Sequence, residues 1–281
     1  MRVTIATPVY GETMSTGCHI SIIDTLRFFG REFPHIGFSS RVLSTSFFPT
    51  ARNVLASNFL ADPTATHLLF VDSDISFSPE LVAKMLASGK PVVGAIYPEK
   101  PADFDAFRRS IGRTSSALHA QMAAVSYVYG GDAILGREGR DGKREIEVID
   151  GFVRVRRAGT GILMIAREAL ETIREKMPDL WVATPSEWLY GIGLSREAGY
   201  IQCFDVVPQR DGTQIGSDVA FSDRWVQGCG GEIWSCVDEA IVRSGADNFV
   251  GHYLTHLQSK ADEGRVIVTS TSGEAADGAA S

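Results

Sequence analysis

The stretch His67-Leu68-Leu69-Phe70-Val71-Asp72-Ser73-Asp74 decides the fold of this chain. Its apolar run is too short for a buried helix and has the length of a buried strand. Two carboxylates follow at once, and Ser-Pro-Glu at 78–80 has the pattern of a helix N-cap, a proline in the first turn and an early acid. The stretch therefore predicts a strand at 67–71 that ends in acidic residues and leads into a helix.

Similar units lie on both sides of this stretch. Runs typical of strands occur at 3–6, 91–97, 161–165 and 201–207, and helical patterns at 19–29, 49–60 and 218–226. This alternation predicts an α/β protein with a mostly parallel sheet, helices on both faces, and ligands at the carboxyl ends of the strands. The patterns are irregular at 98–158 and 178–200. The abundance of Ala, Gly, Ser and Thr at 264–281 predicts a disordered tail.

The overall composition restricts the classes of partner. The formal net charge is −7, and no run of Lys or Arg is present, so capture of nucleic acid or of an anionic membrane surface is not expected. No secretory signal and no stretch of membrane-spanning length is visible, and the four cysteines show no metal or disulfide spacing. We expect a cytoplasmic protein with reduced thiols and no integral membrane segment.

The acidic triplet Asp72-Ser73-Asp74 is weak as an isolated motif, because about one Asp-x-Asp is expected by chance in such a chain. A second one, Asp103-Phe104-Asp105, follows a proline-containing loop and has no such context. The first triplet ends a buried strand, where two carboxylates can both reach a hard divalent cation. The alternative is that one Asp caps the next turn and the other is solvated.

Further motifs surround this triplet in a fixed order. They are Thr-Pro-x-Tyr at 7–10, Ala-Arg-Asn at 51–53, Gly-Thr-Gly-Ile-Leu-Met-Ile at 159–165, Ser-Asp-Val-Ala-Phe at 217–221 and Gly-His at 251–252. Together they resemble GT-A-fold glycosyltransferases of the family-2-like type, in the nucleotide-diphospho-sugar transferase superfamily. The resemblance covers about residues 1–98 and 159–257.

This resemblance implies a single Rossmann-like domain. It would span 1–258, with a nucleotide-binding half at 1–98 and an acceptor-binding half at 99–258. The sheet would be mostly parallel or mixed, with helices on both faces and a small acceptor-side insertion.

The resemblance also implies which residues hold the donor, a UDP- or GDP-sugar. The residues implied for the base, ribose and diphosphate are Thr7, Pro8, Tyr10, Arg52, Asn53, Asp72 and Ser73. An arginine at position 52 has a chemical reason, because its planar guanidinium pairs with two phosphate oxygens at once.

The same family usually binds a divalent cation. The resemblance implies Mn²⁺ or Mg²⁺ held by Asp72, Asp74 and His252, with His256 as the other histidine that can complete the site. A neutral imidazole suits Mn²⁺ better than Mg²⁺. For either histidine, the alternative is an ordinary packed or solvated imidazole.

Asp218 is the expected catalytic base, which takes the proton of the acceptor hydroxyl. Family members usually have Glu-Asp at this place, whereas this chain has Ser217-Asp218. The alternative is that Asp218 only stabilises a helix N-terminus.

Two other segments suggest contacts with sugars. The glycines at 159 and 161 would let a substrate approach the backbone. Trp181, Trp188 and Tyr190 are candidates for stacking against an acceptor sugar, although packing under a long loop is the commoner role of Trp.

The expected function is metal-dependent transfer of a sugar, in the manner of a hexosyltransferase, to a hydroxyl of a glycan or small molecule. Two other classes remain open. One is a non-catalytic module that binds nucleotide sugars or glycans. The other is a sugar-phosphate nucleotidyltransferase, although the loop at 7–16 lacks the basic residue usual in that class.

Overall fold

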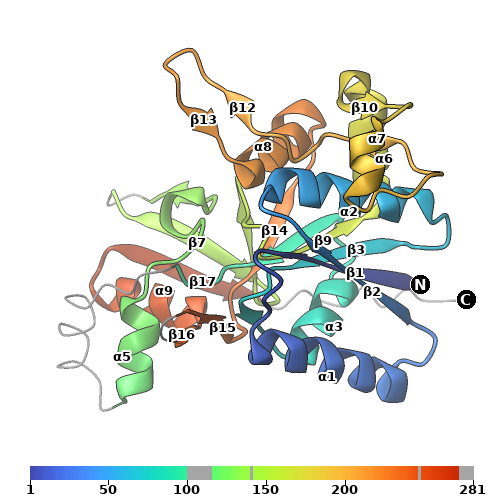
Figure 1. The fold of residues 1–281 in the computed structure, drawn as a ribbon. Coiled ribbons are helices and arrows are strands. Elements are labelled where there is room, and N and C mark those ends of the chain that lie inside the picture. The colour runs from blue at the N-terminus through green and yellow to red at the C-terminus, as the bar shows by residue number, and fades with distance from the viewer. Residues whose placement is uncertain (100–115, 140–141, 246–247, 272–281) are drawn as a thin grey trace, which may run out of the picture.

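The computed structural model describes residues 1–99, 116–139, 142–245 and 248–271. In this part of the chain, ten strands form one mixed sheet in the order β17-β7-β8-β14-β5-β9-β3-β1-β2, with β6 paired to β7. These strands are β1 (Arg2–Val9), β2 (Gly37–Ser44), β3 (His67–Val71), β5 (Val92–Ala95), β6 (Arg137–Glu138), β7 (Arg144–Ile149), β8 (Phe152–Val155), β9 (Ile162–Ala166), β14 (Ile233–Cys236) and β17 (Val266–Thr271). Strands β1, β2 and β3 are parallel, whereas β9 is antiparallel to both β3 and β5. The predicted α/β class with a large mixed sheet is confirmed (Figure 1).

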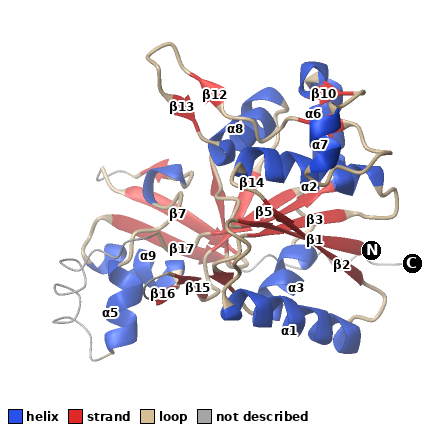
Figure 2. Cartoon of the chain, in the orientation of Figure 1, coloured by secondary structure: helices blue, strands red, loops and turns tan. Residues whose placement is uncertain are grey.

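Helices cover both faces of this sheet (Figure 2). The described helices are α1 (Thr16–Glu32), α2 (Phe48–Ala61), α3 (Pro79–Ala87), α5 (Ala117–Ala124), α6 (Arg167–Lys176), α7 (Glu187–Gly191), α8 (Ser217–Asp223), α9 (Tyr253–Asp262), the short 3-10 turns η1 (Gly131–Ala133) and η2 (Pro178–Leu180), and the π-helix η3 (Arg224–Gly228). The predicted start of α3 is confirmed, because Ser78 Oγ accepts from the Leu81 N–H ahead of Pro79 and Glu80. None of these helices has the length and apolar character needed to cross a bilayer.

Alternation along β3 divides the core into two layers. Leu68 and Phe70 join the cluster that contains α2 and α6 residues, whereas Leu69 and Val71 join the cluster that contains α1 and α3 residues. Side chains of a strand alternate between faces, so position 72 continues on the α2 side. The alternation of side chains along β3 thus places Asp72 on the face of the sheet that α2 covers.

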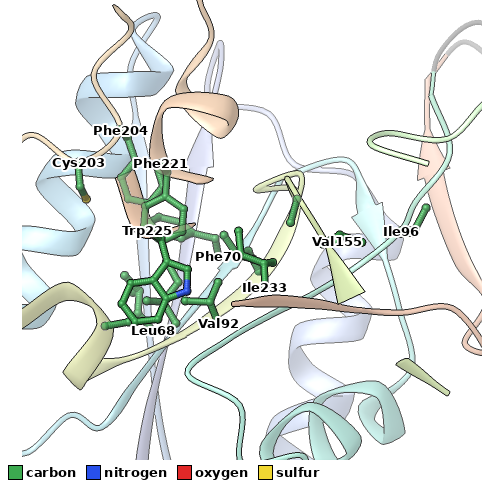
Figure 3. Packing of buried hydrophobic residues seen from close by; sticks show 14 of the residues in the cluster. Leu68, Phe70, Val92, Ile96, Val155, Cys203, Phe204, Phe221, Trp225 and Ile233 are labelled. Carbon is green, nitrogen blue, oxygen red and sulfur yellow. The ribbon is translucent and has the colours of Figure 1, made fainter. Parts of the chain in front are cut away.

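An aromatic stack connects β3 to α8. The rings of Phe70 and Phe204 meet edge to face at 5.2 Å, and Phe204 stacks on Phe221 at 4.7 Å. Figure 3 shows these rings beside Trp225 in the core on the α2 side. Phe221 is one helical turn from the start of α8. Its burial therefore fixes the N-terminus of α8 over the end of β3.

A small sheet lies beside the acidic triplet, with the order β16-β15-β4. Its strands are β4 (Ile75–Ser76), β15 (Ile241–Ser244) and β16 (Asn248–Gly251). Two more pairs are described, β10 (Trp181–Val182) with β11 (Tyr200–Ile201), and β12 (Val207–Pro208) with β13 (Gln214–Ile215).

Two of the expected segments differ in the structure, and a third lies outside the described residues. The tail predicted at 264–281 is wrong for Val266–Thr271, because this segment forms the edge strand β17, parallel to β7. The strand predicted at 201–207 is also wrong, because only the ends of this segment are in strands and a turn lies between them. The second Asp-x-Asp, at 103–105, lies outside the described residues.

All four cysteines are free and buried.

Candidate functional site

An ion pair between Arg52 and Asp72 is the centre of the candidate site. Helix α2 carries Arg52 to the carboxyl end of β3, where Arg52 Nη2 lies 3.0 Å from Asp72 Oδ1. Only 7% of the Arg52 side chain and 18% of the Asp72 side chain is exposed. The Asp72 N–H donates to the Gly161 carbonyl at 2.8 Å, which fixes the end of β3 against the start of β9. Two residues far apart in the sequence thus form a charged pair at the predicted sheet edge.

Asp218 completes this cluster from α8. Its Oδ1 lies 3.8 Å from Arg52 Nη1 and accepts hydrogen bonds from Thr160 Oγ1 at 2.8 Å and Ser217 Oγ at 3.1 Å. Arg52 Nη1 also donates to Ser217 Oγ at 3.2 Å. The structure therefore brings three predicted site residues together, with one guanidinium between two carboxylates.

Charge and burial oppose each other at this cluster. Burial raises the pKa of Asp72 above its ordinary range, and Arg52 acts against that rise. Burial acts to lower the pKa of Arg52, but the carboxylates of Asp72 and Asp218 outweigh it, so the pKa of Arg52 is above its ordinary value. Arg52 therefore stays a cation. Its buried Nε has no hydrogen-bond partner in the described part of the protein.

The β1–α1 loop and the start of α2 present aromatic rings near this cluster. Tyr10 is 62% exposed, and its ring stacks on the Phe48 ring with 6.5 Å between the ring centroids. The Arg52 guanidinium lies 5.6 Å from the centroid of Phe48. Thr7 and Pro8 are buried beneath this loop. Of the three residues expected at a base pocket, only Tyr10 presents its side chain to solvent. Phe48 was not expected from the sequence, because no short motif marks it.

Asn53 has a structural role in this molecule. It is fully buried, its amide nitrogen donates to Asp205 Oδ1 at 2.6 Å, and its Oδ1 accepts from the Phe204 N–H at 2.8 Å. These bonds fix the segment that carries the aromatic stack, and no atom of Asn53 is left for a ligand. The expected contact between Asn53 and the donor is thus not supported here. Ser73, by contrast, is half-buried, and its carbonyl accepts from the Ser15 N–H at 2.8 Å.

The structure does not bring His252 to the acidic triplet. In the small sheet, the Asp74 carbonyl accepts from the Ser244 N–H, whereas Gly251 pairs with Ile241 at the other end of β15. Three residues of strand separate these ends, which is about 10 Å. His252 lies beyond Gly251, and its Nδ1 accepts from the Thr255 N–H as the N-cap of α9.

His256 belongs to an aromatic cluster between α5 and α9. Its ring stacks on the Tyr253 ring, with 5.4 Å between the ring centroids, and lies beside the Tyr127 ring, with 5.1 Å between the centroids. Its Nδ1–H donates to the Ala123 carbonyl at 2.8 Å. No group of three or more His, Cys, Asp or Glu side chains in the described residues is arranged to hold a metal ion. The ligand set expected for Mn²⁺ or Mg²⁺ does not fit this arrangement, and Asp74 forms an ion pair with Arg243 instead.

Titration of His256 gives a prediction for stability. Burial lowers its pKa from the ordinary 6.5, and Lys260 lowers it further, against the Ala123 carbonyl and Glu263. As the pH falls through 6.5, the unfolded imidazole takes a proton that the folded ring resists, so the free energy of unfolding falls. Between about pH 7 and pH 5 we expect a smaller fall in His256→Phe than in the wild-type protein. Urea unfolding across this range measures both slopes, and equal slopes would contradict the assignment.

The glycines at 159 and 161 make room for a protein side chain. A Cβ at Gly161 would lie 2.6 Å from Tyr97 Cζ, and one at Gly159 would also collide with the Tyr97 ring. The Gly161 N–H donates to Tyr97 Oη at 3.0 Å. The expected role of these glycines, close approach of a substrate, is therefore filled by Tyr97.

This packing predicts the effect of a single methyl group. Gly161→Ala should destabilise the protein by about 1–3 kcal/mol, because Tyr97 is fully enclosed and cannot move away. The matched control is Gly30→Ala in α1, where a Cβ meets nothing within 4 Å and about 0.5–1 kcal/mol of added stability is expected. Denaturant unfolding measures both variants. Equal stability of Gly161→Ala and the wild type would show that Tyr97 does not occupy this space.

The aromatic residues expected to stack on an acceptor have different environments. Trp188 on α7 is 57% exposed. Trp181 is half-buried and its ring packs against Arg174, whose guanidinium lies 5.1 Å from the ring centroid. The Tyr190 ring packs against Arg196, whose guanidinium carbon lies 4.5 Å from the ring centroid. Trp188 alone keeps a large free surface.

Comparisons with known proteins give a limited result. No protein-family model matches the sequence, and no curated protein matches it. Among solved structures, the chain is similar to the crystal structure of A197 from STIV, with 15% sequence identity, 87% of this chain and 86% of that chain covered, and a TM-score of 0.43. At this level the likeness carries no argument about the site.

Proposed function

We propose that this protein is a GT-A-type glycosyltransferase, which transfers a sugar from a nucleoside-diphosphate sugar to a hydroxyl of a glycan or small molecule. The observation that carries the proposal is the position of Arg52 between Asp72 and Asp218. These residues come from α2, the end of β3 and the start of α8. Their meeting at the carboxyl edge of the parallel strands supports a ligand site there.

The donor half of the reaction needs positive charge and a surface for the base. The buried cation of Arg52 has an Nε donor without a hydrogen-bond partner among the described residues, and a guanidinium suits the planar recognition of phosphate oxygens. The exposed ring of Tyr10, stacked on Phe48, is suited to stacking against a nucleobase. The Phe48 ring lies 5.6 Å from the Arg52 guanidinium, which in turn pairs with Asp72 at 3.0 Å, so the two features adjoin each other.

The acceptor half needs a base of fixed orientation. Thr160, Ser217 and Arg52 hold Asp218 through Oδ1, whereas the one hydrogen bond that Oδ2 accepts from the described residues is from the Thr160 N–H, at 3.4 Å. In the proposed step, Asp218 Oδ2 takes the proton of the acceptor hydroxyl as its oxygen bonds to the anomeric carbon. The bond from that carbon to the diphosphate breaks, and the nucleoside diphosphate leaves with the electron pair.

The first test is a thermal-shift panel of UDP, GDP, CDP and dTDP, followed by product analysis with the matching nucleotide sugars. We expect one base to stabilise the folded protein, and its sugar to be transferred or slowly hydrolysed. Binding without any turnover would favour the non-catalytic binding module. No shift with any nucleotide, in a protein shown to be folded, would refute the proposed donor class.

A further inference from the structure

A second ion pair lies beside the first, between Asp74 and Arg243. Strand β15 pairs antiparallel with β4, and this register sets Arg243 opposite Ile75, next to the acidic triplet. Arg243 Nε lies 3.2 Å from Asp74 Oδ2, with 22% and 29% of the two side chains exposed. The contact joins residues 169 positions apart in the chain. The pairing of β15 with β4 therefore places the Arg243 guanidinium next to the Asp74 carboxylate.

Neighbouring groups hold Arg243 in this position. Its Nη1 donates to the Pro98 carbonyl at 3.4 Å, and its guanidinium lies 5.4 Å from the centroid of the Tyr97 ring. Tyr97 is in turn enclosed by the two glycines at 159 and 161. Arg243 also acts on Asp72, because its charge opposes the rise in the pKa of that carboxyl. The guanidinium is thus part of the same cluster.

Arg243 occupies the place beside Asp74 that a metal ion would take. Arg52 lies 3.0 Å from Asp72 and 3.8 Å from Asp218, whereas Arg243 lies 3.2 Å from Asp74. Three carboxylates therefore share two guanidiniums in this cluster. Each guanidinium has five N–H donors, so pairing with one carboxylate leaves donors for phosphate oxygens.

We propose that Arg243 takes the place of a divalent cation at this site, so that the protein binds and uses its substrate without a metal. The consequence for catalysis rests on the proposed function, whereas the exclusion of the metal does not. Mn²⁺ bound at Asp74 Oδ2 would have to displace Arg243. In the described part of the chain, no group of three or more His, Cys, Asp or Glu side chains is arranged to hold a metal ion.

The direct test measures Mn²⁺ binding alone, from the loss of the free-ion signal in electron paramagnetic resonance. The wild-type protein should bind no Mn²⁺ at micromolar concentrations. Arg243→His removes the cation and adds an imidazole beside Asp72 and Asp74, so its Mn²⁺ affinity should rise at least about tenfold. Arg243→Lys keeps the positive charge and should bind as weakly as the wild type.

The matched control is Arg157→Ala. Arg157 forms a comparable pair with Asp223, with bonds of 3.1 and 3.0 Å, away from the triplet. Circular dichroism should show that all variants are folded. Micromolar Mn²⁺ binding by the wild type, or an equal gain in Arg157→Ala, would overturn the proposal.

A second measurement separates this proposal from the proposed function. The nucleotide that stabilises the wild type should do so equally in EDTA and in Mn²⁺, and transfer should persist in EDTA. A shift that appears only with Mn²⁺ would overturn the metal-free site and leave the glycosyltransferase proposal intact. No nucleotide binding in either buffer would refute the donor class, while the Mn²⁺ titration alone would still decide the role of Arg243.

Discussion

Replacing Arg52 with alanine is expected to destabilise the protein by about 3–5 kcal/mol, because it leaves a buried carboxylate without its countercharge. The Asp72 side chain is 18% exposed; burial raises its pKa, and the nearby carboxylates of Asp218 and Asp74 raise it further. Nucleotide binding should be lost as well. Urea unfolding and the thermal-shift panel measure the two effects.

The pH dependence of this loss identifies its cause. In Arg52→Ala the pKa of Asp72 should rise further, so ionisation costs more in the folded than in the unfolded state. The penalty appears as the pH rises above the ordinary pKa of Asp, 3.8, and increases towards the folded pKa. The deficit relative to the wild type should therefore be largest near neutral pH and shrink on acidification. A deficit independent of pH would point to lost packing instead.

The double variant Arg52→Met with Asp72→Asn provides the control. It removes both charges of the 3.0 Å pair and keeps similar volumes. We expect it to be more stable than Arg52→Ala, since no unpaired charge stays buried at position 72. If it were less stable, the ion pair would not be the source of the loss.

Asp218→Asn is expected to lower the rate of transfer by about 10²–10⁴-fold, the usual contribution of a positioned general base. The amide oxygen can still accept from Thr160 Oγ1, which donates to Oδ1 at 2.8 Å, so the fold and the donor affinity should change little. Steady-state assays with the nucleotide sugar found by the panel give kcat, and thermal shift gives donor binding.

Asp223→Asn is the matched control on the same helix. Asp223 pairs with Arg157 at 3.0 Å and does not contact Arg52 in the described structure. Its replacement should leave kcat within a few-fold of the wild type. Full activity of Asp218→Asn would falsify the role of Asp218 as base, whatever the result for the control.

The sequence predicted the elements that depend on local patterns. The strand at 67–71 is β3, and the helix expected at 49–60 is α2 at Phe48–Ala61. Arg52, Asp72 and Asp218 were expected in one site, and both carboxylates lie within 4 Å of the Arg52 guanidinium. Strand ends and helix starts carry strong local signals, and the sheet edge brings them together.

The features that sequence reasoning missed depend on long-range pairing. Arg243 lies in a short strand, and nothing near it in the sequence marks its contact with Asp74, which follows from the register of β15 with β4. His252 was expected to face the triplet, but the same small sheet directs it to the opposite end. Strand β17, by contrast, was expected as tail because Ala, Gly, Ser and Thr are abundant in the last eighteen residues. Its β-branched residues Val-Ile-Val-Thr at 266–269 favour a strand, and this local signal was overlooked.

The order of strands also has a consequence for assembly during synthesis. Strand β9 lies between β3 and β5, although it is made after both. As the chain leaves the ribosome, β1, β2 and β3 can pair with one another early, whereas β5 has no neighbour until residues 162–166 have emerged. Residues 1–98 therefore cannot mature as an independent unit, and the apolar β5 stays exposed in the nascent chain for that interval. Slow elongation between positions 98 and 162 would lengthen the time during which this strand can aggregate.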